Sequence, residues 1–160
     1  MTHEIKCKEL NESGILIKSF SFPDQIIDQV KDKNFNFLDQ WMLEACKEGG
    51  LLFDELKQYA NFNSIEHIIA LRKAETDEEG IWHCDGSRNL AFTWSLNLNP
   101  ELIEGGELFF RKKGSDQIMT IHPPEFATLV VFCTGMDGYE HRVGKVKRGE
   151  RLTYAGWCSF

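Results

Sequence analysis

The sequence predicts a mainly β fold, a double-stranded β-helix or cupin-like jelly roll, preceded by helices that pack on one of its two sheets. Apolar residues recur at helical spacing up to about residue 60, and eight short β-type runs follow, separated by Gly, Pro, Asn and Asp. Eight strands is the count of a double-sheet jelly roll. With 160 residues, 42% of them hydrophobic, the chain is long enough for one core. We therefore expect a single domain over 1–160, with helical support over about 1–62 and the jelly-roll core over about 63–160.

The N-terminal part predicts two or three amphipathic helices between Pro23 and about Ala60. A break, "EGG" at 48–50, separates the last apolar group from the earlier ones. The apolar residues at helical spacing are Ile26, Ile27, Val30, Trp41, Leu43, Ala45, Leu51, Leu52, Phe53, Leu56 and Tyr59. They would form the faces that pack on the sheet.

The remaining sequence predicts the strands. In order they are "IEHIIALR", "GIWHCD", "LAFTWSLNL", "GELFFRK", "QIMTI", "ATLVVFC", "YEHRVGKV" and "RLTYAGWC". Gly105 and Gly106, just before "ELFF", predict a hairpin or bulge that serves backbone conformation.

Charge and cysteine content narrow the range of partners and compartments. Eighteen basic residues against 25 acidic ones give a net charge of −7, which disfavours nucleic acid and favours a neutral or cationic target such as a protein side chain. Five scattered cysteines without a CxxC pair indicate reduced thiols. The chain has neither a secretory signal pattern nor an apolar run of about 20 residues. We expect no nucleic-acid partner, no membrane and a cytoplasmic location.

The stretch "IWHCDGS", residues 81–87, is the first candidate site. In an extended strand, alternate side chains share a face, so His83 and Asp85 would project together while Cys84 points away. An imidazole and a carboxylate side by side form two-thirds of the 2-His-1-carboxylate triad that holds non-heme Fe(II). Taken alone, however, the pair is more typical of polar residues at a surface turn than of a metal site.

Four other histidines are available as a third ligand. His3 lies close to the N-terminus, His67 lies in a strand ahead of the site, and His122 precedes two prolines in a predicted turn. His141 lies in a late predicted strand, ten residues (151 − 141) before Arg151. A jelly roll can bring such distant strands side by side, which favours His141.

Several motifs together resemble one family. "HCD", "EGGELFF", "ATLVVF", "HRV" and "GERLTYAGW" occur in the order and approximate spacing of the prolyl-4-hydroxylase-like branch of the Fe(II)/2-oxoglutarate oxygenases. The resemblance covers about 65–160, and the combination is far more specific than any single motif. It implies Fe(II), 2-oxoglutarate as cosubstrate and O2, with ascorbate as a supporting reductant.

The resemblance also implies roles for individual residues. His83, Asp85 and His141 would coordinate Fe(II). Arg151 would bind the far carboxylate of 2-oxoglutarate, for which a planar guanidinium is suited to bidentate pairing. Thr153, two residues later on the same strand face, could add a hydroxyl donor.

Other positions are less regular. Asn97 lies near the position where relatives carry a tyrosine that reaches the same carboxylate. Relatives often have Arg-Tyr where this chain has Arg72-Lys73, so Lys73 either compensates as a cation or points outward. The acidic segment "AETDEEG" borders the substrate entrance in the family and would favour a basic target, unless it is only a solvated loop. The tryptophans Trp82, Trp94 and Trp157 are expected in the core, unless one lines the entrance.

By this resemblance we expect a dioxygenase that hydroxylates a peptidyl residue, with proline as the leading candidate, and forms succinate and CO2. A protein or peptide would then be the substrate. The alternatives are a hydroxylase of a free amino acid or small metabolite, a nucleic-acid demethylase, which the acidic charge disfavours, and a non-catalytic jelly-roll binding module or cupin-like sugar binder. The sequence predicts no oligomeric state.

Overall fold

The computed structural model describes residues 4–160, so His3 lies outside the described residues. Its helices are α1 (Lys8–Ser13), α2 (Gln25–Lys31), α3 (Phe35–Ala45), α4 (Leu51–Lys57) and the 3-10 turn η1 (Pro100–Leu102). Its strands are β1 (Ile15–Ser19), β2 (Ser64–Lys73), β3 (Leu90–Ser95), β4 (Glu104–Gly105), β5 (Leu108–Lys112), β6 (Met119–Ile121), β7 (Thr128–Cys133), β8 (Tyr139–Val143), β9 (Val146–Arg148) and β10 (Glu150–Ser159). Within residues 4–160, no helix has the length and apolar character to cross a bilayer.

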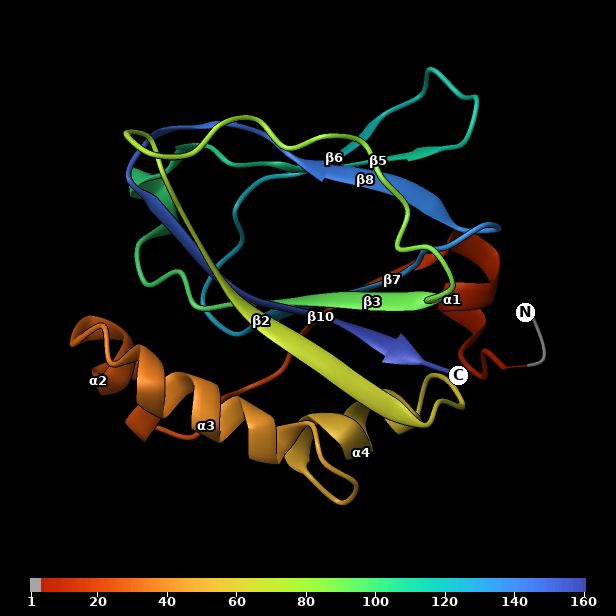
Figure 1. Ribbon diagram of the computed structural model, residues 1–160, viewed down its shortest axis with the longest axis horizontal. Helices are drawn as coiled ribbons and strands as arrows, with labels where there is room; N and C mark the ends of the chain where they lie inside the picture. The colour runs from red at the N-terminus through yellow and green to blue at the C-terminus, as the bar shows by residue number, and fades with distance from the viewer. Residues whose placement is uncertain (1–3) are drawn as a thin grey trace.

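Two antiparallel sheets face each other, as Figure 1 shows. The major sheet has the strand order β1-β7-β3-β10-β2, and the minor sheet has the order β6-β5-β8. A two-stranded ribbon, β4-β9, lies beside them. Helices α2, α3 and α4 cover the outer face of the major sheet (Figure 1). The predicted jelly roll with helices on one sheet is therefore confirmed.

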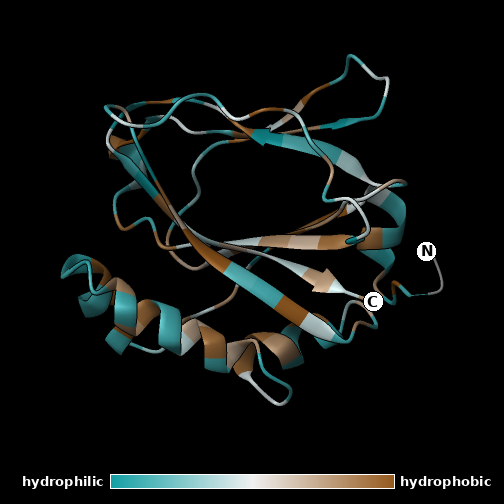
Figure 2. Ribbon diagram, viewed as in Figure 1, coloured by the Kyte–Doolittle hydropathy of each residue, from teal (hydrophilic) through white to brown (hydrophobic). Residues whose placement is uncertain are grey.

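The main core lies between the helices and the major sheet. Along β10, Leu152 and Tyr154 face the helices, and Tyr154 donates a hydrogen bond of 2.7 Å to the carbonyl of Leu38. Trp94 of β3 is fully buried in the same layer. Burial of each such large side chain contributes roughly 1.5–3 kcal/mol. Figure 2 shows β3 mostly in hydrophobic colours, whereas hydrophilic and hydrophobic residues alternate along α2 and α3.

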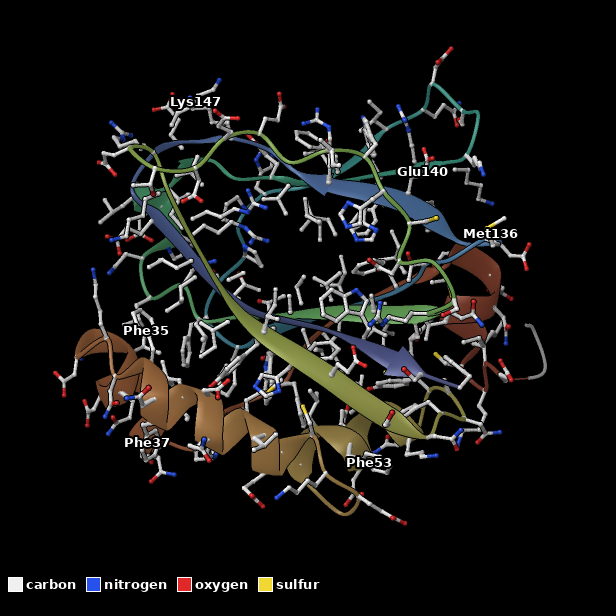
Figure 3. All side chains as sticks on the ribbon, viewed as in Figure 1. Phe35, Phe37, Phe53, Met136, Glu140 and Lys147 are labelled. Carbon is white, nitrogen blue, oxygen red and sulfur yellow. The ribbon has the colours of Figure 1, made fainter. Side chains whose placement is uncertain are left out.

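The predicted helices are confirmed, and α3 illustrates the reason. Leu38, Met42 and Ala45 recur at helical spacing and are buried against the sheet. Asn34 caps the helix, since its side chain accepts a hydrogen bond of 3.2 Å from the amide of Phe37. Phe35 and Phe37, at the start of α3, are labelled in Figure 3.

Three details differ from the predicted elements. The segment 80–85 forms only one isolated bridge, because its backbone leaves the sheet to form a turn after Asp85. The predicted strand 139–146 divides into β8 and β9 at Gly144. The N-terminal part is not purely helical, because β1 pairs with β7 at the edge of the major sheet. The N-terminal part thus contributes a strand to the major sheet in addition to the helices.

Candidate functional site

Two histidines are held opposite each other by the backbone. His83 and His141 form an isolated antiparallel bridge, in which each amide donates to the other residue's carbonyl at 3.1 and 2.9 Å. Residues paired in this way carry their side chains on the same face. The two imidazole rings accordingly lie 4.3 Å apart between centroids. Before it descends to β3, the segment 74–89 runs beside β8 (Figure 1).

Asp85 completes the cluster. Its carboxylate lies 3.6 Å from Nε2 of His83 and 3.5 Å from Nε2 of His141, and one potential ligand atom from each residue lies within 4.8 Å of the others. A metal ion with bonds of about 2.1 Å places ligands at right angles roughly 3 Å apart. The three side chains therefore fit a small octahedral cation with little movement.

The protonation states also suit a metal. Nδ1 of His83 lies 2.9 Å from the carbonyl of Ile81, which can only accept, so Nδ1 carries the hydrogen and Nε2 presents its lone pair. The pKa of His141 is lowered to about 4, chiefly by burial; the charge of Asp85 opposes the shift and that of His83 adds to it. The His141 imidazole is thus neutral near neutral pH and can offer a lone pair to a metal.

A cavity of about 150 Å³ extends from the cluster into the space between the two sheets. Strands β2, β3, β10 and β8 supply most of its walls, and its lining includes Arg72, His83, His141, Arg151 and Trp157. The period of two along β10 places Arg151, Thr153, Ala155 and Trp157 on this inner face. The cavity joins the two predicted histidine ligands to Arg151.

Arg151 is a buried cation without a counterion. Its residue is 3% exposed, and within residues 4–160 its side chain makes no hydrogen bond or ion pair. Burial, and secondarily the charge of Arg72, lowers the pKa of Arg151 to about 10. The hydroxyl of Thr153 is also buried without a partner. Unpaired buried polar groups are rare in native proteins, so these two fit an anion bound between them.

Comparison with known proteins decides the family. The model of the 2OG-Fe(II) oxygenase superfamily matches residues 69–159, more than half of the chain. The chain belongs to this superfamily. It is therefore a dioxygenase that uses Fe(II), 2-oxoglutarate and O2. The residues present fit these groups, because the His83, Asp85 and His141 cluster offers metal ligands and Arg151 offers a cation for a carboxylate.

Solved structures with the same fold include several prolyl hydroxylases. A Pseudomonas putida prolyl-4-hydroxylase is 19% identical, with 95% of this chain and 88% of that chain covered and a TM-score of 0.63. A Trichoplax adhaerens prolyl hydroxylase, solved with a hypoxia inducible factor oxygen degradation domain peptide fragment, is 13% identical over 99% and 88%, with a TM-score of 0.67. At these identities the likeness shows the fold. A search of curated proteins gave no match.

The prediction that Asn97 contacts the cosubstrate of the oxygenase is wrong, because its side-chain amide forms hydrogen bonds with backbone groups. The side-chain oxygen accepts from the amide of Leu152 at 2.8 Å, and the side-chain nitrogen lies 3.4 Å from the carbonyl of Pro124. Asn97 lines a different pocket, on the helix side of the major sheet. We therefore do not retain Asn97 as a cosubstrate contact.

Lys73 and the acidic segment 74–80 also make contacts with groups outside the cavity. Lys73 points away from the oxygenase cavity to Glu150, 3.6 Å away. In the acidic segment, Asp77 accepts from the backbone amide of Lys73 at 2.7 Å, and Glu79 pairs with Arg142. The segment is thus tied to the jelly roll, and one of its four carboxylates, that of Glu79, is paired with a cation.

The three tryptophans occupy three different environments. Trp94 belongs to the core as expected, while Trp157 lines the cavity of the oxygenase. Trp82 lies outside the minor sheet, with the guanidinium carbons of Arg111 and Arg142 at 4.1 and 5.1 Å from its ring centroid. In Figure 3, Glu140 of β8, which pairs with Arg111 at 2.8 Å, marks this outer side.

Two residues near the site were not predicted from the sequence. The hydroxyl of Thr134 accepts from the amide of Asp85 and donates to the carbonyl of Tyr139, both at 3.3 Å, which links the Asp85 turn to β8. Arg72 lies in the cavity wall directly opposite Arg151. The period-two pattern of the strand that contains Arg72 was visible in the sequence, but its register against β10 was not.

Proposed function

We propose that this oxygenase hydroxylates a side chain presented by a peptide or protein, with proline as the first candidate. In this proposal His83, Asp85 and His141 hold Fe(II), and Arg151 and Thr153 anchor 2-oxoglutarate. The observation that carries the proposal is a small cavity whose metal end opens to the surface.

Two quantities support a substrate that enters from outside. The cavity volume of about 150 Å³ is small beside the roughly 300–1,000 Å³ of typical small-molecule pockets. It leaves little room for a second complete molecule beside the cosubstrate. The side chain of His83 is 47% exposed, against 5% for Asp85 and 9% for His141, so the cluster is approached from the His83 side.

The rim on that side is apolar and aromatic. Trp157 lines the cavity, and the guanidinium of Arg88 lies over its ring at 5.2 Å and pairs with Glu66 at 2.8 Å. Ile68, also in the lining, is 47% exposed, and Ile81 is largely exposed next to the cluster. An aliphatic ring such as that of proline can pack against an indole and branched side chains of this kind.

The chain's own residues would bind the cosubstrate, orient it and exclude water from the cavity. When bound, Fe(II) supplies the oxidising chemistry, in which 2-oxoglutarate and O2 give succinate, CO2 and one oxygen atom for a C–H bond. Arg151 would fix the distal carboxylate and so orient the other end of 2-oxoglutarate toward the cluster. Phe110 and Phe132, both buried beside His141, keep water from that wall. Ascorbate as a supporting reductant stays a prediction.

The test compares substrates of increasing size. With Fe(II) and 2-oxoglutarate present, free L-proline, a proline-containing peptide and the same peptide with alanine in place of proline are assayed for succinate and for oxygen incorporation by mass spectrometry. We expect oxygen in the proline-containing peptide only. Turnover of free amino acids with inert peptides would instead support the metabolite hydroxylase.

A matched pair of tryptophan variants locates the substrate. Trp157→Leu should raise the KM for the peptide and lower the ratio of hydroxylated peptide to succinate, because a packing surface beside the cluster is lost. Trp82→Leu, on the outer side of the minor sheet, should leave both unchanged. Equal effects of the two substitutions would count against a substrate at the Trp157 rim.

A further inference from the structure

Two arginines lie opposite each other in the wall of the cavity. Arg151 and Arg72 are direct partners in the antiparallel pairing of β10 with β2, and both line the cavity. Directly opposed residues have Cβ atoms about 4.5–5.5 Å apart and project to the same face. Two arginine side chains therefore leave neighbouring positions on the inner wall, with Arg151 buried and Arg72 half-buried.

Neither guanidinium forms an ion pair with a carboxylate of the described residues, although the charge of Arg72 contributes, after the backbone hydrogen bond from Lys73, to the lowered pKa of Asp77. Within residues 4–160, no carboxylate lies within ion-pair distance of either one, and the hydrogen bond of Arg72 goes to the backbone carbonyl of Glu78 at 3.3 Å. Glu150 is engaged on the opposite face by Lys33 and Lys73. Among groups near the cavity, Asp85 is committed to the two histidines.

This arrangement is unfavourable in the free protein. Two like charges side by side repel each other, and burial of Arg151 removes the water that would screen them. The charge of Arg72 contributes, after burial, to the lowered pKa of Arg151. Opposed like charges in a sheet are normally avoided. An anion placed between the two guanidiniums would remove the repulsion and satisfy both.

We propose that Arg72 is a second cation for the cosubstrate, which shares the distal carboxylate of 2-oxoglutarate with Arg151. The inference rests on Arg151 as the carboxylate anchor, as proposed above. Arg72 then sets specificity, because a 2-oxo acid that lacks the distal carboxylate would leave two cations unpaired. Succinate retains this carboxylate, so the same pair would also retain the product.

The experiment measures 2-oxoglutarate binding apart from turnover. Anaerobic Fe(II)-loaded protein is titrated with 2-oxoglutarate and followed by the charge-transfer absorption of the complex, at low and high salt. Arg72→Gln removes the charge and leaves a shorter polar side chain, so it also gives up the hydrogen bond to the Glu78 carbonyl. Lys73→Gln is the matched control, since its side chain leaves the same strand toward Glu150 on the other face.

Arg72→Gln is expected to weaken the binding of 2-oxoglutarate but to stabilise the ligand-free protein. Arg72→Gln should weaken 2-oxoglutarate binding roughly tenfold or more, as expected for loss of a charge-assisted contact, and reduce its salt dependence. It should raise the Tm of the protein free of metal and cosubstrate, because the repulsion with Arg151 is relieved. Lys73→Gln should leave 2-oxoglutarate binding unchanged, and Arg72→Lys should restore part of it.

Other outcomes separate the two proposals. Unchanged 2-oxoglutarate binding with a lower Tm in Arg72→Gln would show that Arg72 only holds the segment 74–80 through the Glu78 carbonyl, and would overturn the second-cation proposal. If Arg151→Met also left binding unchanged, the anchor itself would be wrong. Loss of binding in Arg151→Met alone would reject Arg72 and keep the anchor.

Discussion

Replacement of Arg151 by methionine should stabilise the ligand-free protein and weaken 2-oxoglutarate binding at the same time. Methionine keeps the aliphatic volume of the side chain and removes a charge that is buried without a counterion. The charge is useful only when an anion is bound. Stability and binding should therefore change in opposite directions.

The magnitude follows from the burial of the cation. Burial, with a smaller contribution from Arg72, lowers the pKa of Arg151 from its ordinary 12.5 to about 10. At about 1.4 kcal/mol for each tenfold change in proton affinity, the charged form costs the fold about 3 kcal/mol. The variant should recover about 1–3 kcal/mol of unfolding free energy. Loss of the contact to the carboxylate should cost about 1.5–3 kcal/mol of binding, roughly 10- to 150-fold in Kd.

Two assays test the prediction. Urea unfolding of metal-free protein gives the stability difference, provided that the m-values of the two proteins agree. The stability difference should be flat from about pH 6 to about pH 9, because the guanidinium is charged in both states there and its cost would fade only as the pH rises through about 10. Anaerobic titration gives the Kd values for 2-oxoglutarate and for Fe(II). Arg148→Met, at an exposed arginine of β9, is the control and should change stability by less than about 0.5 kcal/mol.

A destabilised Arg151→Met protein with an unchanged m-value would refute the reasoning, because it would mean that the cation is satisfied within the fold. Equal weakening of Fe(II) and 2-oxoglutarate would refute it differently, by showing damage to the whole cavity.

Three further predictions concern the metal cluster and the close packing of the Gly106 backbone against the side chain of Arg151. His141→Ala should abolish the Fe(II)- and 2-oxoglutarate-dependent absorption band, whereas the exposed His122→Ala should retain it. Thr134→Val should weaken Fe(II) binding roughly tenfold, because the Asp85 amide loses its hydroxyl acceptor. Gly106→Ala should cost about 1–3 kcal/mol of unfolding free energy, since φ is 70° and the new Cβ would lie 3.1 Å from Cδ of Arg151.

Each of these has a result that would contradict it. An absorption band that survives in His141→Ala would remove that ligand from the proposal. Unchanged Fe(II) affinity in Thr134→Val, measured with an unchanged Tm, would show that the turn at Asp85 keeps its conformation without the Thr134 hydroxyl. A Gly106→Ala protein as stable as the wild type in urea would mean that the positive φ and the close approach are absorbed without strain.

Much of the fold could be predicted from the sequence, because it depends on local periodicity. Apolar residues at helical spacing gave α2, α3 and α4, and alternation in the late runs gave the strands of the jelly roll. The segment 80–85 shows the limit of this reasoning. It has an alternating pattern, yet it forms a single bridge. A strand needs a paired neighbour along its length, and here the pairing with β8 is limited to the His83 bridge and one hydrogen bond from the amide of Gly80 to the carbonyl of Val143.

The residues of the candidate site likewise divide into those that could be predicted from the sequence and those that could not. His83 and Asp85 are neighbours in the sequence, so local geometry sufficed to pair them, and family resemblance pointed to His141 and Arg151. Asn97 was misplaced because its sequence position says nothing about which groups its amide meets. Its partners, the amide of Leu152 and the carbonyl of Pro124, come from distant segments.

The sequence by itself determined which side chains alternate on each strand, the apolar faces of the helices and the HxD pair, because these depend on residues close together along the chain. Only the tertiary structure decided that His83 faces His141 across a bridge and that Arg72 lies opposite Arg151. Both pairings are set by strand register, and register results from packing of the whole sheet against the helices and the second sheet.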